Sequence, residues 1–270
     1  MRIPRLSAGR FPEMIFITYR EIRKNQVTKG LKKAASILFW LLLWQGVSVL
    51  VHNRVLLVGP AETAGALWRL LPDAAFRSSV FFSLTRIWAG LIAGCVSGIL
   101  LAAISFALPV LHTILSPLMQ AMKSVPVACF AVMLLIWTGT AYTAMIVTGL
   151  VVFPILYLNT FQGLCETDRE LVEIADMFTM TRTDRIRHLY GPAAFPFIRS
   201  AVQIACGMSW KSGIAAEVIA QRTMTVGNDL YRAKVLLETD TVFALTVVVV
   251  LLSFLTEKLM LHLMNRISKA

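Results

Sequence analysis

Strongly apolar residues gather in six stretches of this chain, and polar segments separate them. A helix needs about 20 apolar residues to cross the hydrocarbon core of a bilayer, and most of the stretches come close to that length or exceed it. The third stretch is short and contains a proline near its start, so we expect a half-length or tilted span there. The pattern predicts an all-α, polytopic integral membrane protein with about six transmembrane helices, over residues 34–51, 80–108, 125–137, 142–161, 195–220 and 241–263.

The composition agrees with a membrane location. Of the 270 residues, 57% are hydrophobic and only 15% are charged, whereas a soluble domain has about 25% charged residues. No internal repeat is visible, and no polar segment is long enough to fold as a separate soluble domain. We therefore expect three parts, a basic N-terminal arm over residues 1–33, a transmembrane domain over 34–265 and a short tail over 266–270.

A net charge of +11 would suit a protein that binds nucleic acid. The basic residues, however, fall mainly in three groups on one side of the six predicted spans. Lys and Arg mark the cytoplasmic side of a membrane protein, so both termini and the segment 167–192 are predicted to be cytoplasmic, with no nucleic-acid partner. The three groups are Arg2, Arg5, Arg10, Arg20, Arg23, Lys24, Lys29, Lys32 and Lys33, then Arg182, Arg185 and Arg187, and finally Arg266 and Lys269.

The segment 167–192, between the fourth and fifth stretches, is polar and basic. Thr167 and Glu170 have the spacing of a capping box, which predicts the start of a helix. Thr181 is placed to cap a second helix, and Pro192 is expected to end it. The segment is therefore predicted to form a cytoplasmic helix-turn-helix loop.

This loop resembles the conserved loop of ABC importer permeases, whose pattern is Glu-Ala-Ala, three residues, Gly, nine residues and Ile-x-Leu-Pro. Glu173, Ala175 and Pro192 match the pattern without a gap, whereas Thr179 stands where the family has Gly. The order of further motifs is similar to that of the nitrate, sulfonate and taurine branch of these permeases. These motifs are Gly59-Pro60, Ser116-Pro117, Ser124-Val125-Pro126, Trp137-x-Gly139 and Ala216-Glu217.

The resemblance implies a permease of the bacterial cytoplasmic membrane that works as a homodimer and moves a small solute. The solute is either an anion or zwitterion, such as a sulfonate, taurine or nitrate, or a neutral heterocyclic precursor, and the sequence does not decide between them. The resemblance also implies an external solute-binding protein that delivers the solute, and a cytoplasmic ATPase that docks on the loop. The chain has no G-x-x-x-x-G-K-[ST] phosphate-binding motif, so we expect it neither to hydrolyse ATP nor to carry a cofactor. The residues expected to couple to the ATPase are Glu173, Ala175, Asp176, Thr179, Arg182, Arg185, Arg187 and Pro192.

Small residues recur every four positions in the second predicted span, at Gly90, Gly94, Gly98 and Ala102. Such a stripe lets another helix approach closely. The partner helix could belong to the same subunit or to a second copy across a dimer axis.

A polar stripe follows one face of the fifth predicted span, because its side chains fall on one side of a helix that turns about 100° per residue. Charged groups are expensive against lipid, so we expect this face to line the translocation path, with Ala205 and Ser209 packed against protein. Alternatively, the ends of the stripe reach the two membrane surfaces and Glu217 has one buried partner, Lys211 or Arg86. The stripe comprises Arg199, Gln203, Cys206, Trp210, Glu217 and Gln221.

Two other functions fit the sequence less well. A transporter driven by an ion gradient would be expected to show repeats and an intramembrane carboxylate for the coupling ion. We expect that only Glu217 could serve as that carboxylate. A membrane-embedded enzyme would need a nucleophile with its base, or a set of metal ligands. The four cysteines and four histidines are scattered and show no ligand spacing, so we expect no metal site.

Overall fold

The computed structural model describes residue 32, residues 34–53 and residues 55–267. Nearly all of the basic arm predicted for residues 1–33, and most of the tail predicted for residues 266–270, lie outside the described residues. The chain divides into two compact units, Met1–Thr63 and Ala64–Ala270.

The first unit contains a helix over Ala34–Val51, which is long and apolar enough to cross a membrane. Two side chains of this helix hold the residues that follow it. Trp44 Nε1 donates a hydrogen bond to the carbonyl oxygen of Val58 at 2.9 Å, and Ser48 Oγ donates one to that of Leu57 at 3.3 Å. The helix coincides with the first predicted span.

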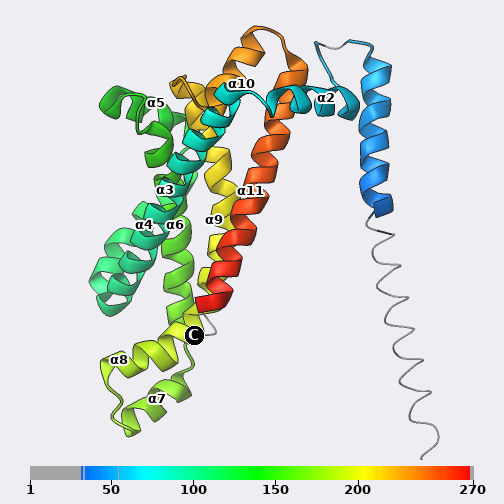
Figure 1. The fold of residues 1–270 in the computed structure, drawn as a ribbon. Helices are drawn as coiled ribbons and strands as arrows, with labels where there is room; N and C mark the ends of the chain where they lie inside the picture. Colours follow the sequence, from blue (N-terminus) through cyan, green and yellow to red (C-terminus); the bar gives the residue numbers. More distant parts are fainter. Residues whose placement is uncertain (1–31, 33, 54, 268–270) are drawn as a thin grey trace, which may run out of the picture. The chain divides into compact units, whose positions relative to one another are not determined.

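The described part of the second unit consists of helices and the turns between them, with no strand. The α7 and α8 helices and the last residues of α11 lie at one end of this unit, whereas α5 and α10 lie at the other (Figure 1). From the boundary between the units onward, the elements are α2 (Pro60–Leu70), α3 (Ala74–Ala107), α4 (Pro109–Ser124), α5 (Val127–Thr138), α6 (Thr143–Cys165), α7 (Arg169–Met177), α8 (Arg182–Arg185), the π-helical turn η1 (Ile186–Tyr190), α9 (Gly191–Ala220), α10 (Val226–Val235) and α11 (Thr239–Ile267).

Helices α3 and α6 pack backbone against backbone along the stripe of small residues. A Cβ atom at Gly94 would lie 2.9 Å from the carbonyl oxygen of Gly149, and one at Gly98 would lie 2.7 Å from that of Phe153. Gly90 meets the carbonyl of Met145 in the same way. Only residues without a Cβ atom permit this approach. Because the contacting carbonyls belong to α6, the partner of the three glycines is a helix of the same subunit.

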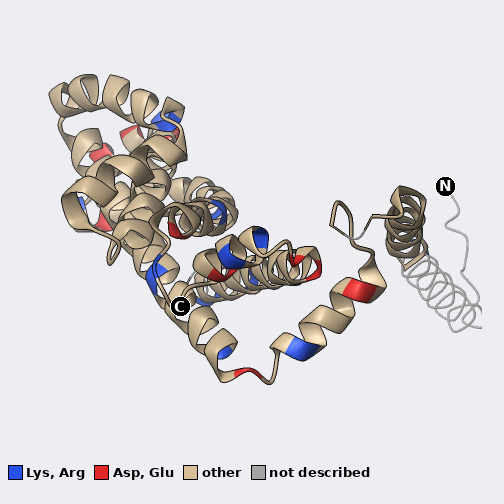
Figure 2. Cartoon of the chain, turned by 90° about the horizontal axis from the view of Figure 1, so that it is seen from above, with Lys and Arg blue, Asp and Glu red and all other residues tan. Residues whose placement is uncertain are grey.

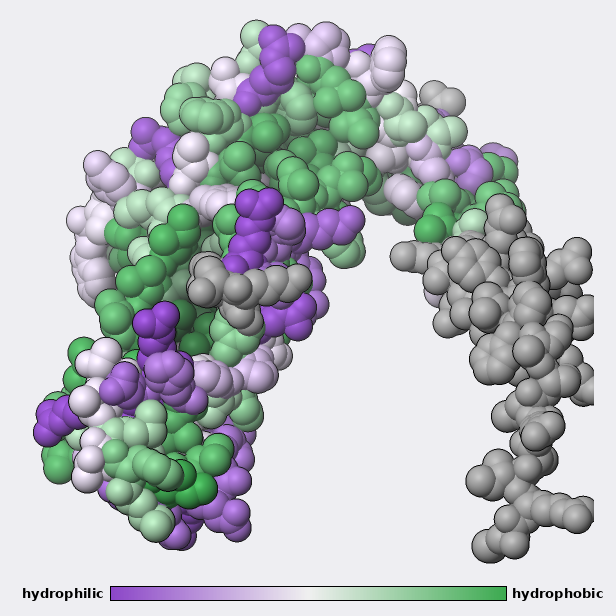
Figure 3. Space-filling model, turned by 60° about the horizontal axis from the view of Figure 1, so that its bottom comes forward, coloured by the Kyte–Doolittle hydropathy of each residue, from purple (hydrophilic) through white to green (hydrophobic). Residues whose placement is uncertain are grey.

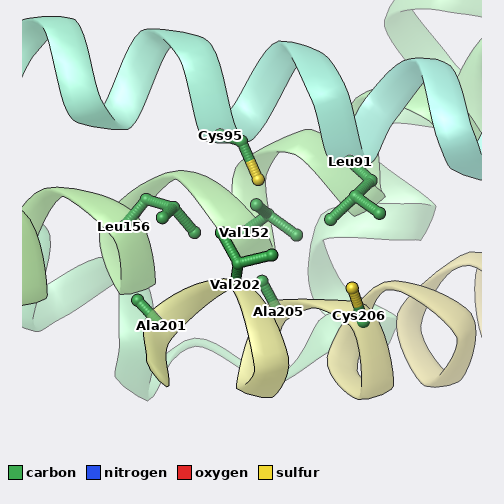
Figure 4. Packing of buried hydrophobic residues seen from close by; sticks show 8 residues of the cluster. All are labelled: Leu91, Cys95, Val152, Leu156, Ala201, Val202, Ala205 and Cys206. Carbon is green, nitrogen blue, oxygen red and sulfur yellow. The ribbon is translucent and has the colours of Figure 1, made fainter. Parts of the chain in front are cut away.

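Helix α9 completes the core of the second unit by packing on α3 and α6 (Figure 4). Small side chains of α9 face branched side chains of the other two helices, so that all three helices come close together. The buried cluster consists of Leu91, Cys95, Val152, Leu156, Ala201, Val202, Ala205 and Cys206.

The third predicted span, residues 125–137, forms the second half of a broken pair of helices. Helices α4 and α5 are bent by 100° relative to one another. The break lies at Val125, whose backbone is extended (φ −73°, ψ 128°), and at Pro126. Proline lacks an N–H group and disfavours a helical residue before it, which explains the bend.

Among the described residues, four helices are long and apolar enough to cross a membrane, and the α4–α5 pair makes a fifth candidate if it counts as one broken span. Helix α9 occupies the position of the fifth predicted span and is 30 residues long, but it is not among these candidates. In the view from above, most of the ribbon is uncharged (Figure 2). The number of six spans stays a prediction.

Replacing Gly90 by alanine should destabilise the fold, because the added Cβ would collide with the backbone of α6. We expect a loss of about 1 to 3 kcal/mol, as for other overpacked sites, measured as a lower midpoint of thermal unfolding in detergent. Gly207→Ala in α9 is the matched control, since a Cβ there meets no atom within 4 Å and alanine favours the helix by about 1 kcal/mol. Equal midpoints for the two variants would contradict the close contact.

Candidate functional site

Helix α7 begins one residue later than the capping-box pattern predicted. Its N-cap is Asp168, whose side chain accepts a hydrogen bond from the backbone N–H of Glu170 at 3.0 Å. The Thr167 hydroxyl instead donates to the carbonyl oxygen of Leu164 at 2.9 Å, at the end of α6. The prediction of a Thr167 cap is wrong because the aspartate satisfies the helix start equally well.

The turn after α7 is sharp although it lacks the glycine of the family pattern. Thr179 adopts a left-handed conformation with φ of 49°. Hydrogen bonds run from Thr179 N to Asp176 O and from Met180 N to Ala175 O, each at 3.0 Å, which is the pairing of a Schellman motif. A threonine in this conformation costs about 1 to 2 kcal/mol, so the turn is maintained by its surroundings.

Arg185 holds the turn from the inside. Its Nη2 donates to Asp176 Oδ1 at 2.6 Å and to the carbonyl oxygen of Ala175 at 3.4 Å, and its Nε donates to the carbonyl oxygen of Met180 at 3.2 Å. The guanidinium thus covers the C-terminal carbonyls of α7, where a positive charge is favoured. Arg185 and Asp176 are therefore committed to the shape of the loop.

The second helix of the loop differs from the expected one. The Thr181 hydroxyl caps α8 by accepting a hydrogen bond from the backbone N–H of Asp184 at 3.3 Å, as the sequence predicted. The helical path does not stop at Pro192, however, but continues through η1 into α9, with Pro192 in the first turn of α9. Proline is well tolerated there because the first N–H groups of a helix need no intrahelical partner.

The remaining predicted coupling residues divide by exposure. Ala175 is buried. The side chains that point to solvent belong to Glu173, Thr179, Arg182, Arg187 and Pro192.

An exposed apolar surface on the loop was not predicted from the sequence. Met177 and Phe178 are 82% and 77% exposed, and other large apolar side chains lie beside them. Figure 3 brings this end of the molecule forward and shows apolar side chains bordered by hydrophilic ones. The three-residue spacing along α7 was the available signal. The loop's apolar face consists of Leu171, Ile174, Met177, Phe178 and Ile186.

The polar stripe of α9 does not lie on a single accessible surface. Arg199, Gln203 and Gln221 are exposed, whereas Trp210 and Glu217 are 1% and 2% exposed. The reason is that α9 is surrounded on several sides, by α3, α6, α10 and α11. Trp210 and Glu217 therefore face the interior of the subunit in this conformation.

Trp210 and Glu217 each have a hydrogen-bond partner on another element, although Glu217 Oε1 is buried without one among the described residues. Trp210 Nε1 donates to Thr256 Oγ1 of α11 at 2.9 Å, and Glu217 Oε2 accepts from Ser83 Oγ of α3 at 2.7 Å. Nearer the N-terminal end of α9, the exposed Gln203 donates a hydrogen bond to Glu257 Oε1 of α11 at 2.8 Å. Glu257 is thus a second carboxylate within a predicted span, one that sequence reasoning missed.

Glu217 also fixes the start of α10. The backbone N–H of Gly227 donates to Glu217 Oε2 at 3.0 Å, and that of Val226 donates to Ser83 Oγ at 2.9 Å. A carboxylate is stabilised by the N-terminal N–H groups of a helix. A Cβ at Gly227 would collide with the Glu217 side chain, so only glycine lets the start of α10 approach Glu217 this closely. The network joins α3, α9 and α10.

Arg86 and Lys211 were the partners considered for Glu217 from the sequence. Lys211 is exposed. Arg86 lies close enough for its charge to act on Glu217. Ala205 and Ser209, expected to pack against protein, are both buried.

The chain is similar in sequence to a known family of transport proteins. The model of a family described as binding-protein-dependent transport system inner membrane component matches residues 87–269. The riboflavin transport system permease protein RibX of Chloroflexus aurantiacus is 23% identical over 77% of this chain and 78% of its own length. The taurine transport system permease protein TauC of Escherichia coli is 27% identical over 68% of this chain and 67% of its own.

A solved structure shares the fold. It is the crystal structure of a bacterial ABC transporter involved in the import of the acidic polysaccharide alginate. The superposition has a TM-score of 0.60 and covers 93% of this chain and 99% of the other, at 13% sequence identity.

Proposed function

The chain belongs to the family of binding-protein-dependent transport system inner membrane components, and from this membership we propose that its α7–α8 loop is where a separate ATPase drives it. The chain is a membrane-embedded permease subunit of an ABC importer. What remains to be assigned is how energy enters, what is carried and which way the chain faces.

The loop's apolar face is the observation that supports ATPase docking best. Large exposed apolar side chains beside charged ones mark surfaces that another protein covers. Exposed apolar and aromatic anchors such as Met177 and Phe178 dominate the energy of such contacts, and Glu173, Arg182 and Arg187 supply a charged rim. Arg185 acts indirectly by holding the turn.

The chain on either side of the loop suggests how docking is transmitted. The loop is inserted between α6 and α9, which both belong to the buried core with α3. A movement of the loop therefore displaces the two helices together. We propose that ATP-driven closure of the ATPases shifts the subunit between inward-open and outward-open states, each favoured by a different nucleotide state.

The relatives carry names that include riboflavin, taurine, aliphatic sulfonates and bicarbonate. We propose that this chain, as a homodimer, moves a small solute of the sulfonate, taurine or nitrate class delivered by an external solute-binding protein. The exposed Arg199, Gln203 and Gln221 are the stripe residues placed to meet solute. Trp210 and Glu217 would position that face from inside the subunit.

We propose that the chain lies in the bacterial cytoplasmic membrane with the loop and both termini in the cytoplasm. The support is the positive-inside distribution of Lys and Arg. The last described residues of α11 lie at the same end of the second unit as the loop (Figure 1).

Phe178→Ala should weaken ATPase binding. We expect the Kd between the permease in nanodiscs and its cognate ATPase to rise about tenfold or more, because truncation of a central aromatic anchor costs about 2 kcal/mol or more. Trp137→Ala is the control, since Trp137 is 71% exposed on α5 at the other end of the unit. If both variants bind the ATPase as the parent does, docking on the loop's apolar face is wrong.

The orientation can be tested with single cysteines at Thr183 in the loop and at Glu238 in the turn before α11, with the exposed Cys129 and Cys165 replaced by serine. In intact cells, an impermeant thiol reagent should label Glu238→Cys but not Thr183→Cys, which should react only after permeabilisation. Labelling of Thr183→Cys from outside would refute the orientation, because the loop could not then meet a cytoplasmic ATPase.

A further inference from the structure

A cavity of about 490 Å³ lies at the end of the second unit opposite the loop. Its wall combines side chains of α3, of the turn between α5 and α6 and of the turn between α9 and α10. The polar and charged residues are Arg86, Thr140, Gln221, Arg222 and Thr223, with Phe82 beside them. The volume is within the range of about 300 to 1,000 Å³ that small-molecule sites occupy.

The cavity holds positive charge that the protein compensates only in part. Arg86 lies with its guanidinium carbon 5.8 Å from the centre of the Phe82 ring. Its Nη1 atom is buried and has no hydrogen-bond partner among the described residues. A buried donor without a partner costs about 1 to 3 kcal/mol, and more when it is charged, so Arg86 has an unmet need for an acceptor.

Arg222 adds a second guanidinium to the same cavity. The two arginines are close enough for their charges to act on one another, and like charges at short range repel. The charge of Glu217 also acts on Arg86. Glu217 Oε2 accepts hydrogen bonds from Ser83 and Gly227, and its Oε1, like Arg86 Nη1, is buried without a hydrogen-bond partner among the described residues. Two positive charges against one negative charge leave the cavity with a net positive charge.

The turn that brings Arg222 into the cavity is conformationally strained. Gln221 and Met224 both adopt left-handed conformations, with φ of 48° and 59°. Non-glycine residues are held in such conformations at a cost of about 1 to 3 kcal/mol each, and they are frequent at ligand clamps. The strain places Gln221, Arg222 and Thr223 together on the cavity wall.

We propose that this cavity binds a small free anion with a sulfonate or carboxylate head group, between Arg86 and Arg222. Arginine binds such planar or tripodal oxygen groups with two parallel hydrogen bonds, and the hydroxyls of Thr140 and Thr223 supply additional donors. The assignment rests on the proposed transport function and deepens it, because it names an anion as the class of solute that meets this end of the permease.

The charge of the cavity can be measured without knowing the natural solute. The full chain carrying Thr223→Cys, with the exposed Cys129 and Cys165 replaced by serine, is placed in phosphatidylcholine nanodiscs. The rate of modification by anionic 2-sulfonatoethyl methanethiosulfonate is divided by the rate for its cationic trimethylammonium counterpart. Adding Arg222→Gln or Arg86→Gln should lower this ratio about tenfold, since clefts lined by one sign of charge raise counter-ion rates by roughly 10-fold or more. Lys234→Gln in α10 lies outside the cavity and should not change it.

Occupancy by an anion is tested with the neutral reagent methyl methanethiosulfonate. Sodium methanesulfonate should slow its reaction with Thr223→Cys at least threefold relative to sodium chloride of equal ionic strength, and this protection should vanish with Arg222→Gln. Neutral dimethyl sulfone should give no protection. Equal effects of methanesulfonate and dimethyl sulfone, or an unchanged rate ratio in both arginine variants, would overturn the proposal.

Two more measurements distinguish a free anion from a lipid head group, and the role of the cavity from the role of the loop. If phosphatidylglycerol in the nanodisc protects Thr223→Cys and methanesulfonate then adds nothing, a lipid head group occupies the cavity and the free-anion proposal is wrong. ATPase binding is measured on the same preparations. Intact ATPase binding without anion protection refutes only the cavity assignment, whereas anion protection without ATPase binding refutes only the proposed role of the loop.

Discussion

The structure depends on the close contact between α3 and α6. Three glycines of α3 lie against backbone carbonyls of α6, and a single methyl group at any of them would force the helices apart. Helix α9 then fills the remaining side of this pair with small side chains (Figure 4). Because packed interiors are nearly incompressible, α3, α6 and α9 form a three-helix core that moves as one body more readily than it deforms. The loop is inserted into this three-helix core, between α6 and α9.

At the end of the second unit opposite the loop, hydrogen bonds join the start of α10 to α3 and α9. Glu217 of α9 holds Ser83 of α3 and the first N–H groups of α10, so the turn that carries Arg222 is anchored where α9 ends. If the proposed ATPase moves the loop, α3, α6 and α9 carry that movement as one body to the cavity between Arg86 and Arg222. The two proposed sites can then respond to each other without a long chain of flexible contacts.

Sequence patterns predicted the class of fold and most of the helices, because apolar length and capping chemistry act locally. The glycine stripe of α3 predicted a close helix contact. Its partner, α6, is determined by tertiary packing and could not be inferred from the stripe. The periodicity of α9 predicted that Trp210 and Glu217 share a face that lines the translocation path. Both side chains are covered, Trp210 by α11 and Glu217 by α3 and α10, so their exposure could not be inferred from one helix alone. The cap at Asp168 was missed because Thr167 and Asp168 are both suitable caps. The left-handed Thr179 could not be predicted, because the contacts of Arg185 that hold the turn are tertiary.

We propose that ATP hydrolysed on a separate subunit, and not an ion gradient, drives transport through this chain. The most direct test of this claim is uptake of radiolabelled taurine and methanesulfonate into proteoliposomes that contain the chain, its cognate ATPase and its solute-binding protein. We expect the transported solute to accumulate against its concentration gradient only when ATP is on the side of the ATPase, with no uptake driven by an imposed proton or sodium gradient. Accumulation driven by an ion gradient without ATP would contradict the claim.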